Sequence, residues 1–230
     1  MNISIKKLSA VALLSISALT FQSCSKDPVA APEIAYLNLI NASPTVGTFN
    51  IYLDKNLINQ NGAVAFNGST GYSQTSPGSH SVKFTTASMQ NVITKNITLE
   101  ANTINSLFLI DKGENIDFFK IKDNLGNLAS AKAFVRFINL SPNAPALNLA
   151  VKEGEVVISD KAYKTSSEFI EIEPKAYVFQ IKDKATGTTA KAELESVELK
   201  AGKSYTIIAT GLLNPSDIEQ PFGGKLMINQ

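Results

Sequence analysis

The chain has 230 residues, which is enough for one or two domains of about 100 to 200 residues each. Apolar residues make up 44% of it, so each domain can build a hydrophobic core. The 21 basic and 20 acidic side chains leave no excess of positive charge to neutralise a phosphate backbone, so we do not expect nucleic acid as a partner.

Residues 1–23 have the three parts of a secretory signal peptide. Lys6 and Lys7 form the charged region, residues 8–21 form the apolar core, and small or polar residues follow. The apolar core is too short for a good membrane-spanning helix, and no second apolar run of spanning length follows. We therefore expect residues 1–23 to be removed on export and any membrane attachment to lie at the N-terminus.

The residues that end at Cys24 resemble the lipobox of bacterial lipoproteins, with Ser23 before the cysteine. Phe21 departs from the strict motif, which has Leu, Val or Ile there. The resemblance implies fatty acyl chains such as palmitate on Cys24, and two or three chains at about 0.8 kcal/mol per buried CH₂ give stable anchoring. The alternative is that Cys24 follows a conventional signal peptide by chance. Because it is the only cysteine, no disulfide can form within one molecule.

Residues 24–34 contain two prolines and no apolar periodicity, so we expect a short tether. Lys26 and Asp27 resemble the charged export signals of surface lipoproteins in the Bacteroidetes. We expect a lipid-anchored protein of the cell envelope, in the outer membrane. The sequence leaves open whether it faces the periplasm or the cell surface.

A repeat with a spacing of 97 to 100 positions organises the rest of the chain. Ile40-Asn41-Ala42-Ser43-Pro44 returns as Ile138-Asn139-Leu140-Ser141-Pro142, and residues 49–53 return as residues 147–151. We therefore predict a first domain at 35–122, a linker at 123–132 and a second domain at 133–230.

Within each repeat, apolar residues alternate with polar ones, as in strands with one buried face. Turn residues separate short runs, and no amphipathic helix of useful length occurs. The sequence therefore predicts an all-β protein with two tandem immunoglobulin-like β-sandwich domains. The predicted strands are 49–53, 79–86, 91–100, 104–110 and 116–122, then 147–151, 176–182, 190–200, 204–210 and 225–229.

Two motifs resemble the family called domain of unknown function 4397. Residues 137–149 resemble its opening H-A-S-P-D-A-P-A-V-D-V, and residues 199–211 resemble its closing L-x-A-G-x-x-Y-T-V-x-A-x-G. Asn139 and Asn143 stand where the family has His and Asp. The resemblance spans nearly all of the second repeat and, more loosely, the first. It implies an exported β-sandwich domain, often in tandem in envelope proteins, with no established activity.

The residues that could serve in catalysis are better explained by structural roles. A Ser-His-Asp hydrolase would have to use His80, the only histidine, as its base. His80 aligns with Tyr177, so we expect an aromatic-sized strand residue there. Ser43 and Ser141 precede prolines and are expected to form turns.

The acidic residues and glycines suggest no site either. Glutamates at 171, 173, 193 and 195 alternate with apolar residues, as on a solvated strand face. Acids at 111, 114 and 117 lie near a turn and could bind calcium weakly, but they lack the spacing of a dedicated loop. Gly223-Gly224 lacks the Lys and Ser/Thr of a phosphate loop. We expect no enzyme activity, metal or cofactor.

Residues 212–224 form a long connection in the second repeat where the first has about five residues. Long loops on rigid sandwiches often bind partners, and the alternative is an irregular connection that covers an edge. Asn214, Asp217 and Phe222 are the candidate binding residues. We expect a non-catalytic binding or spacer module with an envelope protein or a glycan as partner. The alternative is a glycan-binding surface lipoprotein of a polysaccharide-uptake system, although the chain has no Trp to serve as a sugar platform.

Overall fold

The computed structural model describes residues 32–187 and 190–229. Cys24, the signal peptide and most of the expected tether lie outside these residues. The all-β prediction is confirmed, because the described part contains strands and a single short 3₁₀ helix, η1 (Gly113–Asn115). No helix in it is long and apolar enough to cross a membrane.

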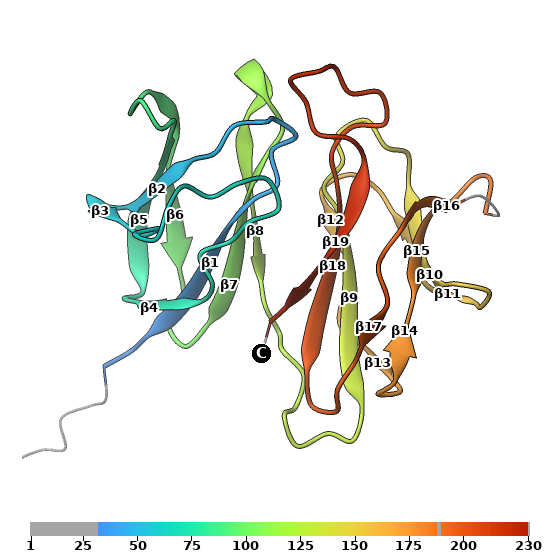
Figure 1. The fold of residues 1–230 in the computed structure, drawn as a ribbon. Coiled ribbons are helices and arrows are strands. Elements are labelled where there is room, and N and C mark those ends of the chain that lie inside the picture. The colour runs from blue at the N-terminus through green and yellow to red at the C-terminus, as the bar shows by residue number, and fades with distance from the viewer. Residues whose placement is uncertain (1–31, 188–189, 230) are drawn as a thin grey trace, which may run out of the picture. The chain divides into compact units, whose positions relative to one another are not determined.

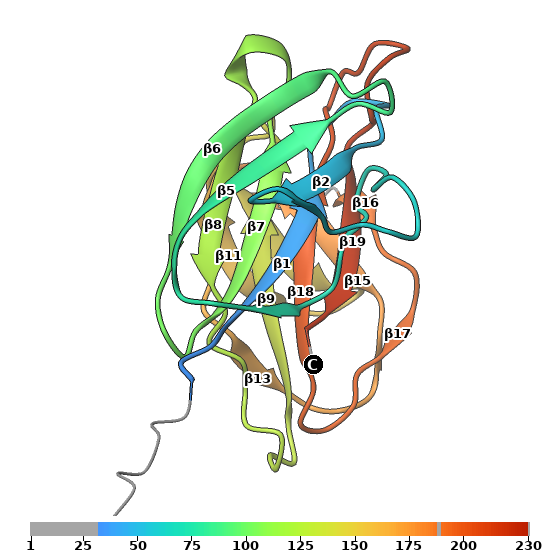
Figure 2. The same cartoon turned by 90° about the vertical axis from the view of Figure 1, so that its left-hand side faces the viewer.

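The first repeat is a sandwich of two sheets (Figure 1). One sheet has the order β4-β1-β7-β8 and the other β3-β2-β5-β6. In Figure 2, β2, β5 and β6 lie in front of β1 and β7, so the two sheets form two layers. The strands are β1 (Ala35–Asn41), β2 (Asn50–Leu53), β3 (Asn56–Leu57), β4 (Ser73–Thr75), β5 (Gly78–Thr85), β6 (Asn91–Leu99), β7 (Ile104–Ile110) and β8 (Asp117–Lys122).

The second repeat has the same arrangement. Its sheets have the orders β12-β9-β18-β19, with β13 also paired to β9, and β11-β10-β15-β16, and a short ladder joins β14 to β17. The strands are β9 (Ala133–Asn139), β10 (Leu147–Val151), β11 (Val156–Lys161), β12 (Thr165–Ser166), β13 (Ile170–Ile172), β14 (Ala176–Tyr177), β15 (Phe179–Asp183), β16 (Ala190–Glu193), β17 (Val197–Glu198), β18 (Ser204–Thr210) and β19 (Gly223–Ile228).

The central pair of strands in each repeat is parallel, while the other pairs are antiparallel. Leu37 of β1 pairs with Asn105 of β7, and Val135 of β9 pairs with Tyr205 of β18 at the matching place. β9 and β18 are buried along their whole length, and β1 is buried except at Tyr36. Such strands are covered on both faces, so their buried positions do not alternate with exposed ones.

Three hydrophobic clusters explain this double burial. Each sandwich encloses its own core, one around Phe84 and the other around Phe179. A third cluster joins the outer faces of the two central strand pairs, and residues 33–230 form one compact unit. Its buried members are Ile40, Ala42, Phe108 and Ile110 from the first repeat and Ile138, Leu140 and Ile208 from the second.

The predictions of single strands at 176–182 and 190–200 are wrong, because each is broken in the structure. Tyr177 pairs with Val197, and Gln180 pairs with Glu193. Between these pairs, the two residues 178–179 on one strand face the three residues 194–196 on the other. One extra residue of this kind is a β-bulge, which interrupts the ladder and bends the strand.

The segment between the repeats packs onto the second one. The backbone N–H of Gly126 donates a 3.0 Å hydrogen bond to Ser204 Oγ. A Cβ at Gly126 would collide with the ring of Phe134, so only glycine allows this approach. Asp123, at the start of the segment, is 4% exposed.

Candidate functional site

The repeated Asn-x-Ser-Pro box forms a hydrogen-bonded corner. Ser43 donates its hydroxyl to the carbonyl of Asp111 at 2.6 Å, and Ser141 donates to the carbonyl of Gly211 at 2.7 Å. Both acceptor residues have a left-handed backbone, with φ of 60° and 78°. The two serine hydroxyls therefore tie a strand end to the turn after β7 or β18, which is a structural role.

His80 is held by two acceptors. Its Nδ1 lies 3.0 Å from Asp54 Oδ2, and its Nε2 lies 2.8 Å from the carbonyl oxygen of Ser76. Desolvation alone would lower the pKa of His80, but the bonds to Asp54 and Ser76 outweigh it and raise the pKa above 6.5. A general base needs a free nitrogen aimed at a nucleophile. Neither nitrogen of His80 is free.

The acidic candidates are solvated or paired with lysines. Glutamates 171, 173, 193 and 195 are exposed, and Glu193 accepts hydrogen bonds of 2.8 Å from Lys152 and from Gln180. The acids suggested for calcium do not converge. Asp111 pairs with Lys164 at 3.2 Å and Asp117 with Lys95 at 2.7 Å, while Glu114 is exposed. Within the described residues, no group of three or more His, Cys, Asp or Glu could hold a metal ion.

Residues 212–224 lie against the first repeat. The backbone N–H of Gln220 donates to the carbonyl of Pro44 at 3.1 Å, and Glu219 pairs with Lys112. Asn214 is exposed and lines a cavity of about 290 Å³ together with residues of both repeats, such as Asn115 and Asn143.

The other two candidates of this loop lie elsewhere. Asp217 is exposed and does not line that cavity, while Phe222 is half-buried and packs against the core of the second repeat. The structure therefore does not bring Asn214, Asp217 and Phe222 together. Two residues after Phe222, the backbone of Gly224 packs closely against the side chains of Leu194 and Ile181. A Cβ at Gly224 would lie 2.6 Å from Leu194 and 2.8 Å from Ile181.

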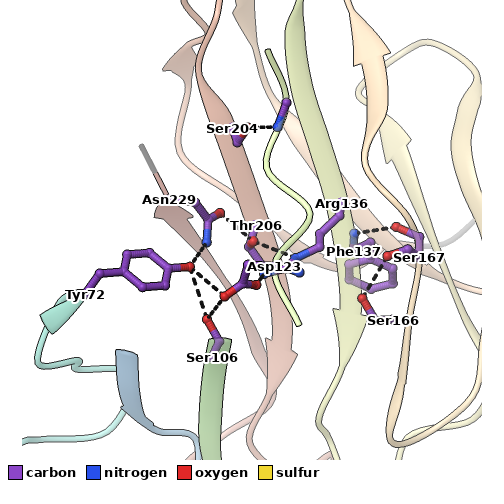
Figure 3. Close-up of polar contacts among 11 residues, drawn as sticks. Tyr72, Ser106, Asp123, Arg136, Phe137, Ser166, Ser167, Ser204, Thr206 and Asn229 are labelled. Carbon is purple, nitrogen blue, oxygen red and sulfur yellow. Dashed lines mark hydrogen bonds and ion pairs between the residues drawn. The ribbon is translucent and has the colours of Figure 1, made fainter. Parts of the chain in front are cut away.

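A buried polar network joins the two repeats, and sequence reasoning missed it. Arg136 is the only arginine of the chain and is 3% exposed in the central strand β9. Its Nη2 forms an ion pair with Asp123 Oδ1. The other carboxylate oxygen, Oδ2, accepts hydrogen bonds from Tyr72 at 2.9 Å and Ser106 at 2.8 Å, both from the first repeat (Figure 3).

The network closes through the second repeat. Arg136 Nε donates to Thr206 Oγ1 at 2.9 Å, and Thr206 donates to Asn229 Oδ1 at 2.6 Å. Asn229 Nδ2 then donates to the hydroxyl of Tyr72 at 2.8 Å. Burial raises the pKa of Tyr72 to about 12, and the charge of Asp123 adds to the rise. The phenol therefore stays protonated and can donate to the carboxylate.

The two repeats contribute matching groups with different charges. Asp123 and Asn229 each follow the last strand of a repeat, and their backbone N–H groups donate to residues 104 and 204. Ser106 and Thr206 are the matching hydroxyls. Arg136 replaces Asn38 of the first repeat, whose buried Oδ1 accepts no hydrogen bond from the described residues. At each of these two matching places, one repeat has an asparagine and the other has a charged residue. The charged residues, Asp123 and Arg136, form the ion pair across the junction.

Arg136 also lines a cavity of about 280 Å³. Its guanidinium lies over the ring of Phe169, with Cζ 4.6 Å from the ring centroid. The remaining lining residues are Ile121, Lys122, Asn124, Ser166, Ser167 and Glu168. A signal for this site was present in the sequence, because the single arginine stands in the apolar run Phe134-Val135-Arg136-Phe137-Ile138. Arginine in such a run requires a buried partner.

Comparisons with known proteins give one family and several distant structures. The family model DUF4397, domain of unknown function, matches residues 35–150. The match covers the first repeat and the opening strands of the second, while the closing motif at 199–211 lies outside it. No curated protein matches the chain.

The similar solved structures come from several bacteria. A streptococcal virulence factor, described for alpha-glucan binding, is 12% identical, with 77% of this chain and 92% of that chain covered and a TM-score of 0.26. The Bacillus anthracis TIE protein is 13% identical, with 78% and 34% covered and a TM-score of 0.26. A Bacteroides eggerthii protein described as a candidate for cell adhesion is 10% identical, with 89% and 98% covered and a TM-score of 0.24. At these TM-scores none of them indicates what this chain does.

Proposed function

Because the chain belongs to the DUF4397 family of domains of unknown function, we propose a function from its own contacts: a non-catalytic binding or spacer module of the cell envelope. The observation that carries this proposal is the junction between the repeats. A shared hydrophobic cluster and a buried ion pair both cross it. A junction of this kind holds two sandwiches as one rigid body, which suits presenting a surface at a fixed place.

The contacts of the candidate catalytic residues support a non-catalytic role. The hydroxyls of Ser43 and Ser141 are used by backbone carbonyls, and both ring nitrogens of His80 face acceptors. Nucleophilic catalysis needs a hydroxyl or thiol within reach of a free base. These three residues are instead used to hold the fold.

Attachment through Cys24 completes the proposal. Lipid on the first residue after the signal peptide would leave the tether and both sandwiches outside the bilayer, in the periplasm or on the cell surface. We propose the outer membrane because Lys26 and Asp27 resemble the charged export signals of surface lipoproteins in the Bacteroidetes.

A labelling experiment tests the anchor. Cells that express the full chain are grown with a radiolabelled fatty acid, and the protein is then isolated. The wild type and a Ser25→Ala control should carry the label, and Cys24→Ala should carry none. Equal labelling of all three, or of none, would contradict anchoring at Cys24.

A second experiment tests the fixed presentation. Spin labels are attached at two exposed positions, Asn96→Cys in the first repeat and Lys191→Cys in the second, in a Cys24→Ala background. The distance distribution between the labels should have a single narrow maximum. A broad distribution would show that the repeats move independently and would contradict a rigid module.

A further inference from the structure

The cavity beside Arg136 has an excess of hydrogen-bond donors. The guanidinium has five N–H groups, and its two hydrogen bonds to the described residues use Nε and Nη2. Nη1 makes no hydrogen bond to these residues. Fully buried side-chain atoms without a hydrogen bond occur at four other described residues, and Nη1 is not among them, so it is not fully buried. Nη1 therefore reaches open space, and the open space beside this 3% exposed side chain is the cavity that it lines.

Asp123 does not satisfy these remaining donors. Its Oδ1 accepts from Nη2 of Arg136, and its Oδ2 accepts from Tyr72 and Ser106. The ion pair neutralises the overall charge of Arg136, but it leaves Nη1 without an acceptor among the described residues. A donor that is held in place by a buried ion pair is preorganised for a ligand, since it loses little side-chain entropy on binding.

Ser167 and Asn124 are among the other polar residues that line this cavity. Ser167 Oγ accepts the backbone N–H of Phe137 at 3.0 Å, and its hydroxyl proton has no acceptor among the described residues (Figure 3). Asn124 is exposed, and its side chain makes no hydrogen bond to those residues. The hydroxyl of Ser166 is used, because it donates to the carbonyl of Ser167 at 2.8 Å. Lys122 also lines the cavity, and its ammonium lies 3.5 Å from Glu100 Oε2. The groups that can donate into the cavity are thus Arg136, Ser167, Asn124 and Lys122.

We propose that this cavity binds a carboxylate group. A guanidinium presents parallel N–H groups that match the two oxygens of a carboxylate, and a hydrogen bond to a charged acceptor is about twice as strong as a neutral one. The ring of Phe169 packs against the guanidinium and helps to hold it at the cavity. The carboxylate can belong to an acidic sugar or to an acidic peptide side chain, because both present the same group.

The charge of Glu168 affects how tightly the cavity should bind a carboxylate. Glu168 lines the cavity, is exposed, and forms no ion pair with a described residue. Its charge opposes an incoming carboxylate, while Lys122 at the same cavity attracts one, so we expect the binding of a small acid to be weak. The proposal goes beyond the envelope role above, and it stands or fails separately, because binding does not depend on lipid at Cys24.

The single arginine makes a direct test possible. A ¹H–¹⁵N spectrum of the full-length chain contains one arginine Nε–H signal, from Arg136. Sodium acetate, sodium glucuronate and an N-acetylated, C-amidated aspartate should each shift this signal in a saturable way. Sodium chloride at equal ionic strength and methyl glucoside should not. No shift with any carboxylate overturns the proposal, and a tighter response to phosphate or sulfate than to acetate also overturns it.

Glucuronate and the blocked aspartate distinguish the two sources of the carboxylate. Tighter binding of glucuronate than of acetate indicates an acidic sugar, and tighter binding of the aspartate derivative indicates an acidic peptide. Either result supports a carboxylate site.

Exposed residues at the cavity provide variants that leave the fold intact. Asn124→Asp adds a repelling charge and should weaken acetate binding about threefold or more, while Glu168→Gln removes one and should strengthen it by a similar factor. Asn115→Asp makes the same change as Asn124→Asp at an exposed position outside this cavity and should have no effect. Equal effects of Asn124→Asp and Asn115→Asp would show that only overall charge matters, which would contradict a local site.

Discussion

Asp123, which follows the last strand of the first repeat, forms a buried ion pair with Arg136 of the second. The side chains are 0% and 4% exposed. A buried pair costs desolvation energy that an apolar contact does not, so it is weak evidence for stability. Here it joins the two repeats, because the carboxylate of Asp123 accepts from Arg136 of the second repeat and from Tyr72 and Ser106 of the first.

Removing one member of this pair should be strongly destabilising. Asp123→Ala leaves the charge of Arg136 buried without its partner, and we expect the free energy of unfolding to fall by about 3–5 kcal/mol. Urea denaturation measures this loss. Asp217→Ala, at an exposed position, is the control and should change it by less than about 0.5 kcal/mol. A loss of less than about 1 kcal/mol for Asp123→Ala would contradict the burial of the pair.

His80 should titrate above its usual value. Because it is the only histidine, its ring protons give one set of NMR signals to follow with pH. We expect a pKa above 6.5, and Asp54→Asn should lower this pKa by removing the carboxylate that accepts from Nδ1. A wild-type pKa at or below 6.5 would show that desolvation dominates.

The same shift predicts how stability depends on pH. The folded pKa is raised, so the stabilisation by His80 is fully present below the unfolded pKa of about 6.5 and is lost as pH rises through the folded pKa. The free energy of unfolding of the wild type should therefore decrease on going from pH 6 upward, relative to that of His80→Asn. Parallel curves for the two proteins would contradict the linkage.

The glycine after β18 should not tolerate a side chain. Gly211 has φ 78°, and a Cβ there would collide with the carbonyl of Pro221, so Gly211→Ala should destabilise the fold by more than about 1 kcal/mol. Asp111 holds the matching position in the first repeat with φ 60°. Asp111→Gly should stay within about 1 kcal/mol, because relief of the left-handed backbone offsets the lost ion pair with Lys164. Thermal unfolding measures the stability of both variants relative to the wild type. Equal losses of stability for Gly211→Ala and Asp111→Gly would contradict this prediction.

The sequence predicts β2 well because one of its faces is partly solvated. Phe49, Ile51 and Leu53 alternate with polar residues, and Ile51 and Leu53 are inward-facing members of β2. Turn residues also mark the bounds of β7 and β18, which were predicted without error. The central strands β1 and β9 were not predicted as strands. Their second faces are covered by the other repeat, which removes the alternation.

The buried network could not be derived from spacing. Its members lie at positions 72, 106, 123, 136, 206 and 229, and they meet only because two sheets pack face to face. Of these residues, only Arg136 stands out in the sequence, because it is a charged residue within an apolar run. The length of the loop at 212–224 marks it as a candidate binding loop, but length does not reveal that part of it contacts the first repeat.

Whether the two repeats unfold together tests the central claim most directly. Native-state hydrogen exchange in increasing urea, read by mass spectrometry, follows peptides from β7 and β18 separately. If the shared cluster and the ion pair make one rigid body, both strands should exchange through the same opening, with equal free energies and equal dependence on urea. If β7 opens at a lower free energy than β18, or the reverse, the repeats are independent and the account of a single rigid module is wrong.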